Sequence, residues 1–419
     1  MLTKSDFDAF LMEYFTPALK EKTRYDDHPF LAMVPKDEKA AGEYSLTTID
    51  LHDGAEGSTS FDKALAIGRG ATPVKKQFQF DWKLAYDIAQ ISNAAIRTSR
   101  DRAHALQKAA DEYERCEQRL GNKIARGLYR TGFGEKGQIG STTTLSTAII
   151  ILADPADARF YTPGDRLVFS SAVGTATLRG GGAYVSVTKV DIDSGTITTD
   201  APVSLQASIS GIATSDYIFP DGDREDSASA TRQLFPGLAG HIPDSTPSAT
   251  TFGGVDRTIF VNRLAGLRYP ASGTASGDPR ETFLRALAHG GNHRAKISHC
   301  FVAPNVYANL LISLEGSHLR TIEEKVGSVG FAGFEFSTGY TPKPLKVFVD
   351  GDCPASHAYG LKLDTWVLQS LGEMIQDDLI GSKNGVRDVE DASAIEYRRV
   401  FHGHLACKDP GQNIVIKFT

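Results

Sequence analysis

One stretch of this sequence limits the possible folds more than any other: residues 100–132, RDRAHALQKAADEYERCEQRLGNKIARGLYRTG. It predicts a single helix, which at ~1.5 Å per residue is about 45 Å long. Apolar residues recur at steps of three or four and define one stripe: Leu106, Ala109 or Ala110, Tyr113, Cys116, Leu120, Ile124 and Leu128. A helix with one apolar stripe buries that side only. We therefore expect it to lie along a sheet or another element rather than through a core.

The composition predicts a soluble, mildly acidic protein with more than one domain. Its 419 residues are enough for two or three domains with cores of their own. The 51 acidic residues exceed the 45 basic ones, and the net charge of −6 argues against a dedicated nucleic-acid-binding protein. The longest apolar run, AIIILA (148–153), is too short to cross a bilayer.

The cysteines and the first residues indicate where the protein is made. The four cysteines stand far apart in the sequence, so neither a CxxC pair nor a disulfide framework is expected: Cys116, Cys300, Cys353 and Cys407. Asp6 and Asp8 stand where a signal peptide carries basic and then apolar residues. We expect synthesis without export, in a reducing cytoplasm.

The first hundred residues predict a projecting arm. Residues 5–19 have the apolar spacing of a short amphipathic helix. Two strands are predicted at 43–51 and 76–82, where Phe78, Phe80 and Trp82 alternate with polar residues. Residues 52–73 between them read as a long loop rich in Gly, Ser and Asp, either an arm tip with a function or an ordinary surface loop. Residues 84–97 predict a short helix that leads into the long one.

The rest of the chain divides into a β module and an α/β region. Residues 141–222 lose helical periodicity and carry short strands between TPG, RGGG and DSG turns, which predicts an inserted barrel or sandwich. After a loop-rich segment at 236–254, helices are predicted at 281–291 and 305–315, and a buried strand at 296–304. Residues 344–372 predict strand, turn and strand, and residues 394–418 two closing strands around DPGQN.

Two histidine pairs and a glycine motif are weighed as binding sites. GFGEKG (132–137) matches GxGxxG, but a nucleotide site needs a strand before it and a helix after it, so these glycines are read as a helix end and hinge. In HGGNH, His289 and His293 stand four apart, but we expect the two glycines to break the helical turn that a zinc site needs. His402 and His404 are interpreted as ordinary strand residues.

The remaining acidic motifs complete no site. DIDSG (191–195) and DGDRED (221–226) lack the glycine and the distal glutamate of an EF-hand loop, so the first is read as a hairpin turn and the second as a solvated linker. No GxSxG elbow and no P-loop occurs. We therefore assign no catalytic, cofactor-binding or metal-binding residue and expect no enzyme activity.

The order of these parts resembles the major capsid proteins of tailed bacteriophages, which have the HK97-type fold. The most family-like phrases are QFQFDWKLAYDIAQISNAAI (77–96), VDRTIFVNRLAGL (255–267) and LKVFVDGDCPASHAYGLKLDTWVL (345–368). The resemblance implies an α+β fold with these parts: an N-terminal arm at 1–42, an E-loop hairpin at 43–83, the spine helix of the peripheral (P) domain at 84–137, an inserted β domain at 138–222, the rest of the P domain at 223–269, an axial (A) domain at 270–390 and closing strands at 391–419.

The same resemblance implies a protein that assembles with copies of itself. It implies an icosahedral head shell around double-stranded DNA, built in the host cytoplasm from hexamers and pentamers and held in the virion. Some members begin with a long scaffolding segment, whereas only about forty residues precede the first predicted strand here, so a separate scaffolding protein is expected, with a portal and an optional decoration protein. Lys63, Lys75 and Lys76 lie in or beside the arm, and no crosslink is assigned to them.

Three alternatives stay open at this point. One is an encapsulin-like shell. Another is an enzyme with a β substrate-binding module, whose site would consist of Asp350, Asp352 and His357. A third is a carbohydrate-binding or tail-associated structural protein. Shell size, host and the role of the β insertion do not follow from the sequence.

Overall fold

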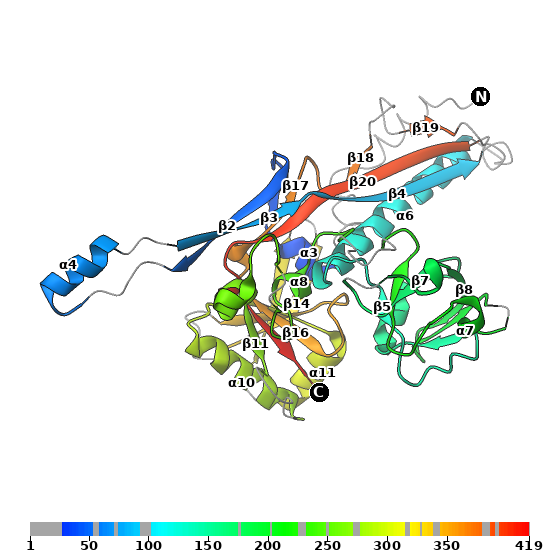
Figure 1. The fold of residues 1–419 in the computed structure, drawn as a ribbon. Helices are drawn as coiled ribbons and strands as arrows, with labels where there is room; N and C mark the ends of the chain where they lie inside the picture. Colours follow the sequence, from blue (N-terminus) through cyan, green and yellow to red (C-terminus); the bar gives the residue numbers. More distant parts are fainter. Residues whose placement is uncertain are drawn as a thin grey trace. The chain divides into compact units, whose positions relative to one another are not determined.

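The computed structural model describes the following residues: 27–52, 58–70, 74–92, 102–174, 177–201, 203–224, 232–248, 251–270, 277–314, 319–326, 329–337, 344–378, 386–389 and 394–418. The helix predicted at 5–19 lies outside them. The chain forms two compact units: Met1–Ala125, His241–Gly351 and Ser356–Thr419 make up the first, and Arg126–Gly240 with Asp352–Ala355 the second. Helices and mainly antiparallel sheets occur together, which confirms the predicted α+β class (Figure 1).

The first unit contains a seven-stranded sheet in the order β11-β21-β16-β12-β15-β14-β13. Its strands are β11 (Leu267–Tyr269), β12 (His299–Val302), β13 (Leu319–Val326), β14 (Val329–Phe336), β15 (Leu345–Val349), β16 (His357–Leu361) and β21 (Ile414–Lys417). Two helices, α10 (Pro279–Asn292) and α11 (Pro304–Leu314), pack against each other and against strands of this sheet. Because helices cover this sheet, strands β12 and β21 are buried over most of their length and consist mainly of apolar residues.

A six-stranded sheet of the same unit is built around the long strand β20 (Ala394–Cys407). Its other strands are β1 (Lys36–Asp37), β4 (Lys83–Ser92), β17 (Trp366–Ser370), β18 (Gln376–Asp377) and β19 (Val386–Asp388). Strand β4 pairs with β20 along its whole length, from Lys83 opposite Gly403 to Ser92 opposite Ala394. The other edge of β20 pairs in turn with β17, β18 and β19.

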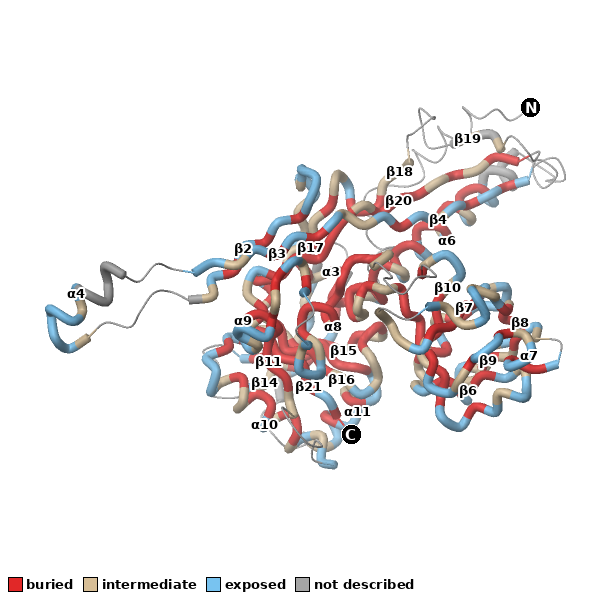
Figure 2. Tube along the Cα trace, viewed as in Figure 1, coloured by how far each residue is buried: buried red, intermediate tan, exposed pale blue. Residues whose placement is uncertain are grey.

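Residues 84–92, which the sequence predicts as part of a short helix at 84–97, belong to strand β4 instead. Ala85, Ala89 and Ile91 are buried, and the residues between them are exposed or half-buried, which is the period-two pattern of a strand (Figure 2). The same apolar residues also fit helical spacing, and pairing with β20 over ten residues decides between the two patterns. The described residues leave out 93–101, which include the remainder of that predicted helix, 93–97.

The region 344–372 also differs from its prediction of strand, turn and strand. It holds three strands, β15, β16 and β17, and they belong to two sheets. Strand β12 lies between β15 and β16, so the two predicted strands do not pair with each other. The two predicted closing strands exist as β20 and β21, in different sheets.

The long helix predicted at 100–132 is confirmed as α6 (Arg102–Tyr129). Its predicted stripe is buried wherever the side chains are described: Ala109, Ala110, Tyr113, Cys116, Leu120, Ile124 and Leu128. Within the first unit the helix lies on the sheet around β20, because Arg399 of β20 donates to Glu117 and Tyr397 meets the Tyr113 ring edge-on. Arg119 also donates to Asp87 of β4, at 2.8 Å.

The two predicted arm strands form the antiparallel hairpin β2 (Tyr44–His52) and β3 (Val74–Asp81). The segment between them, predicted as a loop, contains the helix α4 (Phe61–Gly70), which starts after the Ser-rich stretch and carries Asp62 in its first turn. One side of the hairpin packs into a small apolar cluster with the segment that follows residue 250: Ile49, Phe78, Phe80, Phe252, Val255 and Leu264.

The second unit is dominated by a six-stranded sheet in the order β5-β10-β7-β8-β9-β6. Its strands are β5 (Gly137–Gln138), β6 (Ile149–Ile151), β7 (Arg166–Ser170), β8 (Val185–Asp191), β9 (Thr196–Thr199) and β10 (Tyr217–Pro220). One apolar core fills it, with fully buried Ile139, Ile150, Leu167, Phe169 and Ile218 among its members. A β module with a core of its own is what the sequence at 141–222 predicts.

The remaining helical segments are short. They are α3 (Pro29–Met33), η1 (Pro155–Phe160), η2 (Arg179–Gly181), α7 (Leu205–Ser208), α8 (Leu238–His241), η3 (Arg257–Phe260), α9 (Val261–Ala265), η4 (Leu363–Thr365) and η5 (Pro410–Gln412). Several begin at an Asp or Ser whose side chain accepts a backbone N–H, as Asp154 does for η1 and Ser204 for α7.

Candidate interaction surface

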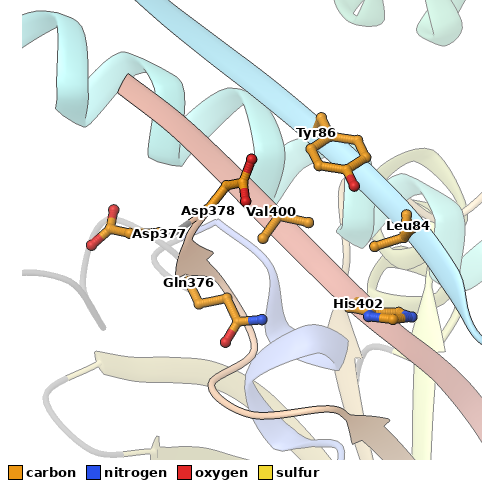
Figure 3. Close-up of a pocket in the computed structure, with 7 residues that line it drawn as sticks. All are labelled: Leu84, Tyr86, Gln376, Asp377, Asp378, Val400 and His402. Atoms are coloured by element: carbon orange, nitrogen blue, oxygen red, sulfur yellow. The ribbon is translucent and has the colours of Figure 1, made fainter. Parts of the chain in front are cut away.

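A groove of about 410 Å³ lies in the first unit, on the side of β4 and β20 opposite α6. Leu84 and Tyr86 of β4 and Val400 and His402 of β20 form one part of its lining, and the segment Gln376, Asp377 and Asp378 forms the rest (Figure 3). We call this surface, together with Ile88, the outer groove. It is open to solvent, and its strands are held from behind by α6.

Strand periodicity explains why apolar side chains face outward here. Leu84, Tyr86 and Ile88 alternate with the residues that face α6, and they are 44%, 51% and 48% exposed. Their partners across the strand pair are His402, Val400 and Arg398. Three large apolar side chains in a row on an exposed sheet face are typical of a surface that another molecule covers.

The polar side of the outer groove is held in place by ion pairs. Asp377 accepts from Arg399 at 2.5 Å, and Asp378 accepts from Arg387 at 3.2 Å. Burial lowers the pKa of Arg399, but Tyr113, Glu117 and Asp377 outweigh this effect and hold it above its usual value. Burial also lowers the pKa of the His402 imidazole, which favours its neutral form. The groove offers an apolar floor with Asp378 beside it, whereas the Asp377 carboxylate lies on the α6 side, with Arg399 and Tyr113 (Figure 3).

A second exposed apolar surface lies on α4, between the two hairpin strands. Phe61 and Leu65 stand one turn apart, so they share a face of the helix, and they are 78% and 39% exposed. Lys75 of β3 pairs with Asp50 of β2 at 3.3 Å, which supports the hairpin near its end. The hairpin therefore carries an apolar face of its own.

The glycine motif at 132–137 lies at a helix end, as predicted. Helix α6 ends at Tyr129, and Gly132 and Gly134 have φ values of +95° and +87°, which other residues rarely adopt. A Cβ atom at Gly132 would lie 2.8 Å from the backbone nitrogen of Pro236. The motif is followed by β5 rather than by a helix, so its backbone does not form a phosphate cradle.

The expectation that two glycines break the helical turn between His289 and His293 is wrong. Helix α10 continues through Gly290 and Gly291 to Asn292, so the glycines do not break the turn. The two rings lie 4.8 Å apart, and burial, with a smaller effect of His293, lowers the pKa of His289. No group of three His, Cys, Asp or Glu side chains in the described part of the chain is arranged to hold a metal ion.

His402 and His404 share a face of β20 but have different surroundings. His402 lines the outer groove, whereas His404 is completely buried and stacks on Phe80 of the hairpin at 4.5 Å. The hairpin thus covers the same face of β20 that stays open at His402. The interpretation as ordinary strand residues misses the role of His404 in packing.

The two acidic motifs behave as local structure. In DIDSG, Asp191 accepts the backbone N–H of Ser194 at the β8–β9 turn, which confirms the predicted hairpin turn. The interpretation of 221–226 as a solvated linker is wrong at Arg224. That side chain is buried, lies 5.0 Å from the Phe219 ring and donates to the Val173 carbonyl at 2.7 Å.

The residues of the enzyme alternative have structural contacts. Asp350 accepts the backbone N–H of Phe30 at 3.0 Å, and His357 Nε2 lies 3.7 Å from Asp244 Oδ2. Hydrogen bonds from His357 and Lys417 hold the pKa of Asp244 well below its usual value. Asp352 belongs to the second unit, whereas Asp350 and His357 belong to the first. These contacts tie the seven-stranded sheet to its surroundings.

This chain is similar to several solved structures. No family model and no curated protein matches the chain. Among solved structures, it is similar to the capsid of cyanophage A-1(L), with 13% identity over 93% of this chain and 92% of that chain and a TM-score of 0.48.

Two further solved structures are similar to the chain. The capsid of the native GTA particle has 10% identity, coverage of 93% and 89%, and a TM-score of 0.41. The SrpI encapsulin of Synechococcus elongatus has 6% identity, coverage of 97% and 88%, and a TM-score of 0.40. In the described part of the chain, no helix has the length and apolar character needed to cross a membrane.

Proposed function

We propose that this chain is a major capsid protein, which assembles with copies of itself into an icosahedral head shell around double-stranded phage DNA. The observation that carries the proposal is the presence of two separate apolar surfaces in one unit, the outer groove and the Phe61–Leu65 face of α4. The hairpin that bears α4 is fixed to its own unit by the small cluster around Phe78 and Phe80. An arm anchored in this way is suited to reach a neighbouring copy.

Assembly supplies the burial that these surfaces lack in one copy. Fully burying a Leu, Ile or Phe side chain contributes about 1.5–3 kcal/mol, so several such residues together support a stable contact. A subunit with two different complementary surfaces makes head-to-tail contacts, which close into rings and shells when the rotation between copies allows it. The net charge of −6 suits a container for DNA, because a strongly basic lining would hold the DNA too firmly for release.

The parts of the capsid fold are assigned within this proposal. The hairpin at 43–83 is the E-loop, α6 is the spine of the P domain, and the second unit's sheet is the inserted β domain at 138–222. Strands β12 to β16 of the seven-stranded sheet belong to the A domain at 270–390, whereas β11 and β21 of the same sheet lie outside these bounds. Because β17, β18 and β19 pair with β20, we place them with the P domain, together with β4.

The same proposal names partners and a place of action. The subunit has no enzymatic role. It assembles in the host cytoplasm with a separate scaffolding protein and a portal, meets DNA only through non-specific contacts and remains in the virion. The outer groove and the Phe61–Leu65 face of α4 support self-association, since both expose apolar side chains.

Removing the arm tip tests the proposal. We expect replacement of residues 53–73 by Asn-Gly to leave a folded subunit that forms no shells. His52 and Val74 are paired in the hairpin, and Asn-Gly is the favoured two-residue connection for such a pair. Circular dichroism reports folding, and negative-stain microscopy with and without a coexpressed scaffold reports rings, spirals or shells. Shells from the shortened subunit, or failure of that subunit to fold, would contradict the role assigned to the tip.

Substitution in the outer groove gives an independent test. We expect Leu84→Lys to abolish assembly while changing the free energy of unfolding by no more than about 0.5 kcal/mol, because Leu84 lines the groove and its side chain is exposed in the single subunit. Gln90→Lys is the matched control, since Gln90 is exposed on the same face of β4 outside the groove lining. Light scattering measures assembly, and urea unfolding measures stability. If the two variants assemble equally well, the outer groove is not part of the interface between subunits.

A further inference from the structure

The last turn of α10 presents two histidines, His289 and His293, on one face of the helix. Residues four positions apart lie one above the other on a helix surface. Gly290 and Gly291 stand between them in the sequence, but the helix continues through both, so the two side chains keep their helical spacing. His293 is exposed and His289 is half-buried, which leaves this face open to small solutes.

Backbone contacts fix the end of this helix. The backbone N–H groups of His293 and Ala295 donate to the Gly290 carbonyl, at 3.1 Å and 2.9 Å. Arg294, with a φ of +57°, is the left-handed residue that ends the helix. A Cβ atom at Gly290 would lie 3.1 Å from Cδ1 of Ile297, so the glycine permits close packing of the chain that follows. Helical positions of this kind hold metal ligands more precisely than loops do.

The spacing of the two rings fits one shared metal ion. The ring centres of His289 and His293 lie 4.8 Å apart, and their planes are inclined by 70°. A transition metal lies about 2.0–2.1 Å from an imidazole nitrogen and therefore about 3.2 Å from the centre of that ring. When the two metal–nitrogen bonds make an angle of about 90–110°, as in square-planar and tetrahedral sites, the ring centres are about 4.5–5.3 Å apart. The observed spacing falls within this range.

The electrostatic surroundings suit a bound cation. Burial, and to a smaller extent the neighbouring His293, lower the pKa of His289, which favours the neutral imidazole that binds metals. The carbonyl end of a helix carries a partial negative charge, which attracts cations. One turn before His289, the cation Arg285 forms an ion pair with Glu281, and this pairing offsets part of its charge.

We propose that His289 and His293 bind one divalent transition-metal ion of the group Cu²⁺, Ni²⁺ and Zn²⁺, with water in its remaining positions. Imidazole nitrogen suits these metals, whereas Mg²⁺ and Ca²⁺ prefer oxygen ligands. In the described residues no third His, Cys, Asp or Glu joins the pair, so the bound metal stays accessible to a further ligand. The site belongs to the single chain, and its existence does not depend on shell assembly.

The expected size of the effect follows from chelation. Once one ring holds the metal, the other ring meets it at a high effective concentration, which raises the overall affinity about 100-fold above that of one ring. Removal of either ring should therefore weaken binding about 100-fold. Among the three metals the affinity should be highest for Cu²⁺.

Calorimetric titration of the full-length chain with Ni²⁺, near neutral pH in a buffer that does not bind metals, measures this affinity. We expect His289→Gln and His293→Gln each to raise the dissociation constant about 100-fold, and the wild type to show no binding of Mg²⁺ at the same concentrations. Circular dichroism checks that each variant keeps its helix content. A wild-type chain that binds Ni²⁺ no more tightly than either variant overturns the proposal.

A relocated histidine provides the matched control. Ala288→His combined with His289→Gln keeps the number of histidines but places the pair at 288 and 293, about 140° apart around the helix axis. We expect this variant to bind Ni²⁺ as weakly as His289→Gln alone. Binding as tight as that of the wild type would show that other groups hold the metal, and it would overturn the proposal. The two single variants decide alone if the relocated one does not fold.

Discussion

Replacing Arg399 by methionine is expected to lower the free energy of unfolding of the first unit by about 3–5 kcal/mol. Arg399 is buried and donates to Glu117 through Nε at 2.9 Å and through Nη2 at 2.5 Å, while Nη1 donates to Asp377. Its guanidinium also lies 4.9 Å from the Tyr113 ring. Without Arg399, the buried carboxylate of Glu117 on α6 loses its partner, and an uncompensated buried charge is costly.

The measurement uses the tryptophans of the chain. Trp82 and Trp366 are its two tryptophans, and both belong to the first unit, so fluorescence during urea unfolding reports that unit. Arg398→Met is the matched control: Arg398 pairs with Glu396 at 2.5 Å, its side chain is 36% exposed, and a loss below about 1 kcal/mol is expected. Glu117→Leu combined with Arg399→Met should recover most of the loss, because no buried charge then stays unpaired. A loss for Arg399→Met no larger than that of the control would show that the pair does not hold α6 on β20.

Local periodicity predicts α6 well because the pattern is long and unambiguous. Seven stripe positions from Ala109 to Leu128 recur at helical steps, and all are buried. The sequence does not indicate which partner covers the stripe, since the contact between Glu117 and Arg399 joins residues 282 positions apart. Long-range pairing of this kind depends on the folded sheet and leaves no local signal.

The sequence does not predict the outer groove, because the pattern of β4 is ambiguous. Its apolar residues satisfy both helical and strand spacing, and only its pairing with β20 selects the strand. Interpreting 84–97 as a helix places Tyr86 on the side opposite Leu84 and Ile88, and so it hides the exposed row. The alternation of Leu84, Tyr86 and Ile88 is the signal that reveals it, once the segment is considered as a strand.

The sequence predicts the two strands of the arm, but it does not predict the helix at the arm's tip. Residues 52–73 contain Gly, Ser and Asp in the proportion of a loop, and the helix α4 occupies only Phe61–Gly70 within them. The packing of His404 against Phe80 also escapes the sequence, because a histidine in a strand gives no indication of whether an arm covers it. Both features depend on where the hairpin meets the rest of its unit.

Replacing Gly237 by alanine is expected to destabilise the second unit by about 3 kcal/mol, at the upper end of what overpacking costs. A Cβ atom there would lie 2.2 Å from the Gly127 carbonyl oxygen and 2.4 Å from that of Leu128, in the last turns of α6. Backbone atoms of a helix cannot move aside as a flexible side chain can. Gly237 N–H also donates to the Arg130 carbonyl at 3.0 Å, which fixes the close approach of the two segments.

Hydrogen exchange of β7 and β8 amides measures this loss, because these strands lie in the core of the second unit. Gly174→Ala is the matched control in the same unit, since its Cβ would meet only the Phe133 ring at an ordinary 3.9 Å. We expect that variant to exchange like the wild type. If Gly237→Ala also does, the segment before α8 is free to move away from α6, and the end of the long helix is held by the stripe residues instead.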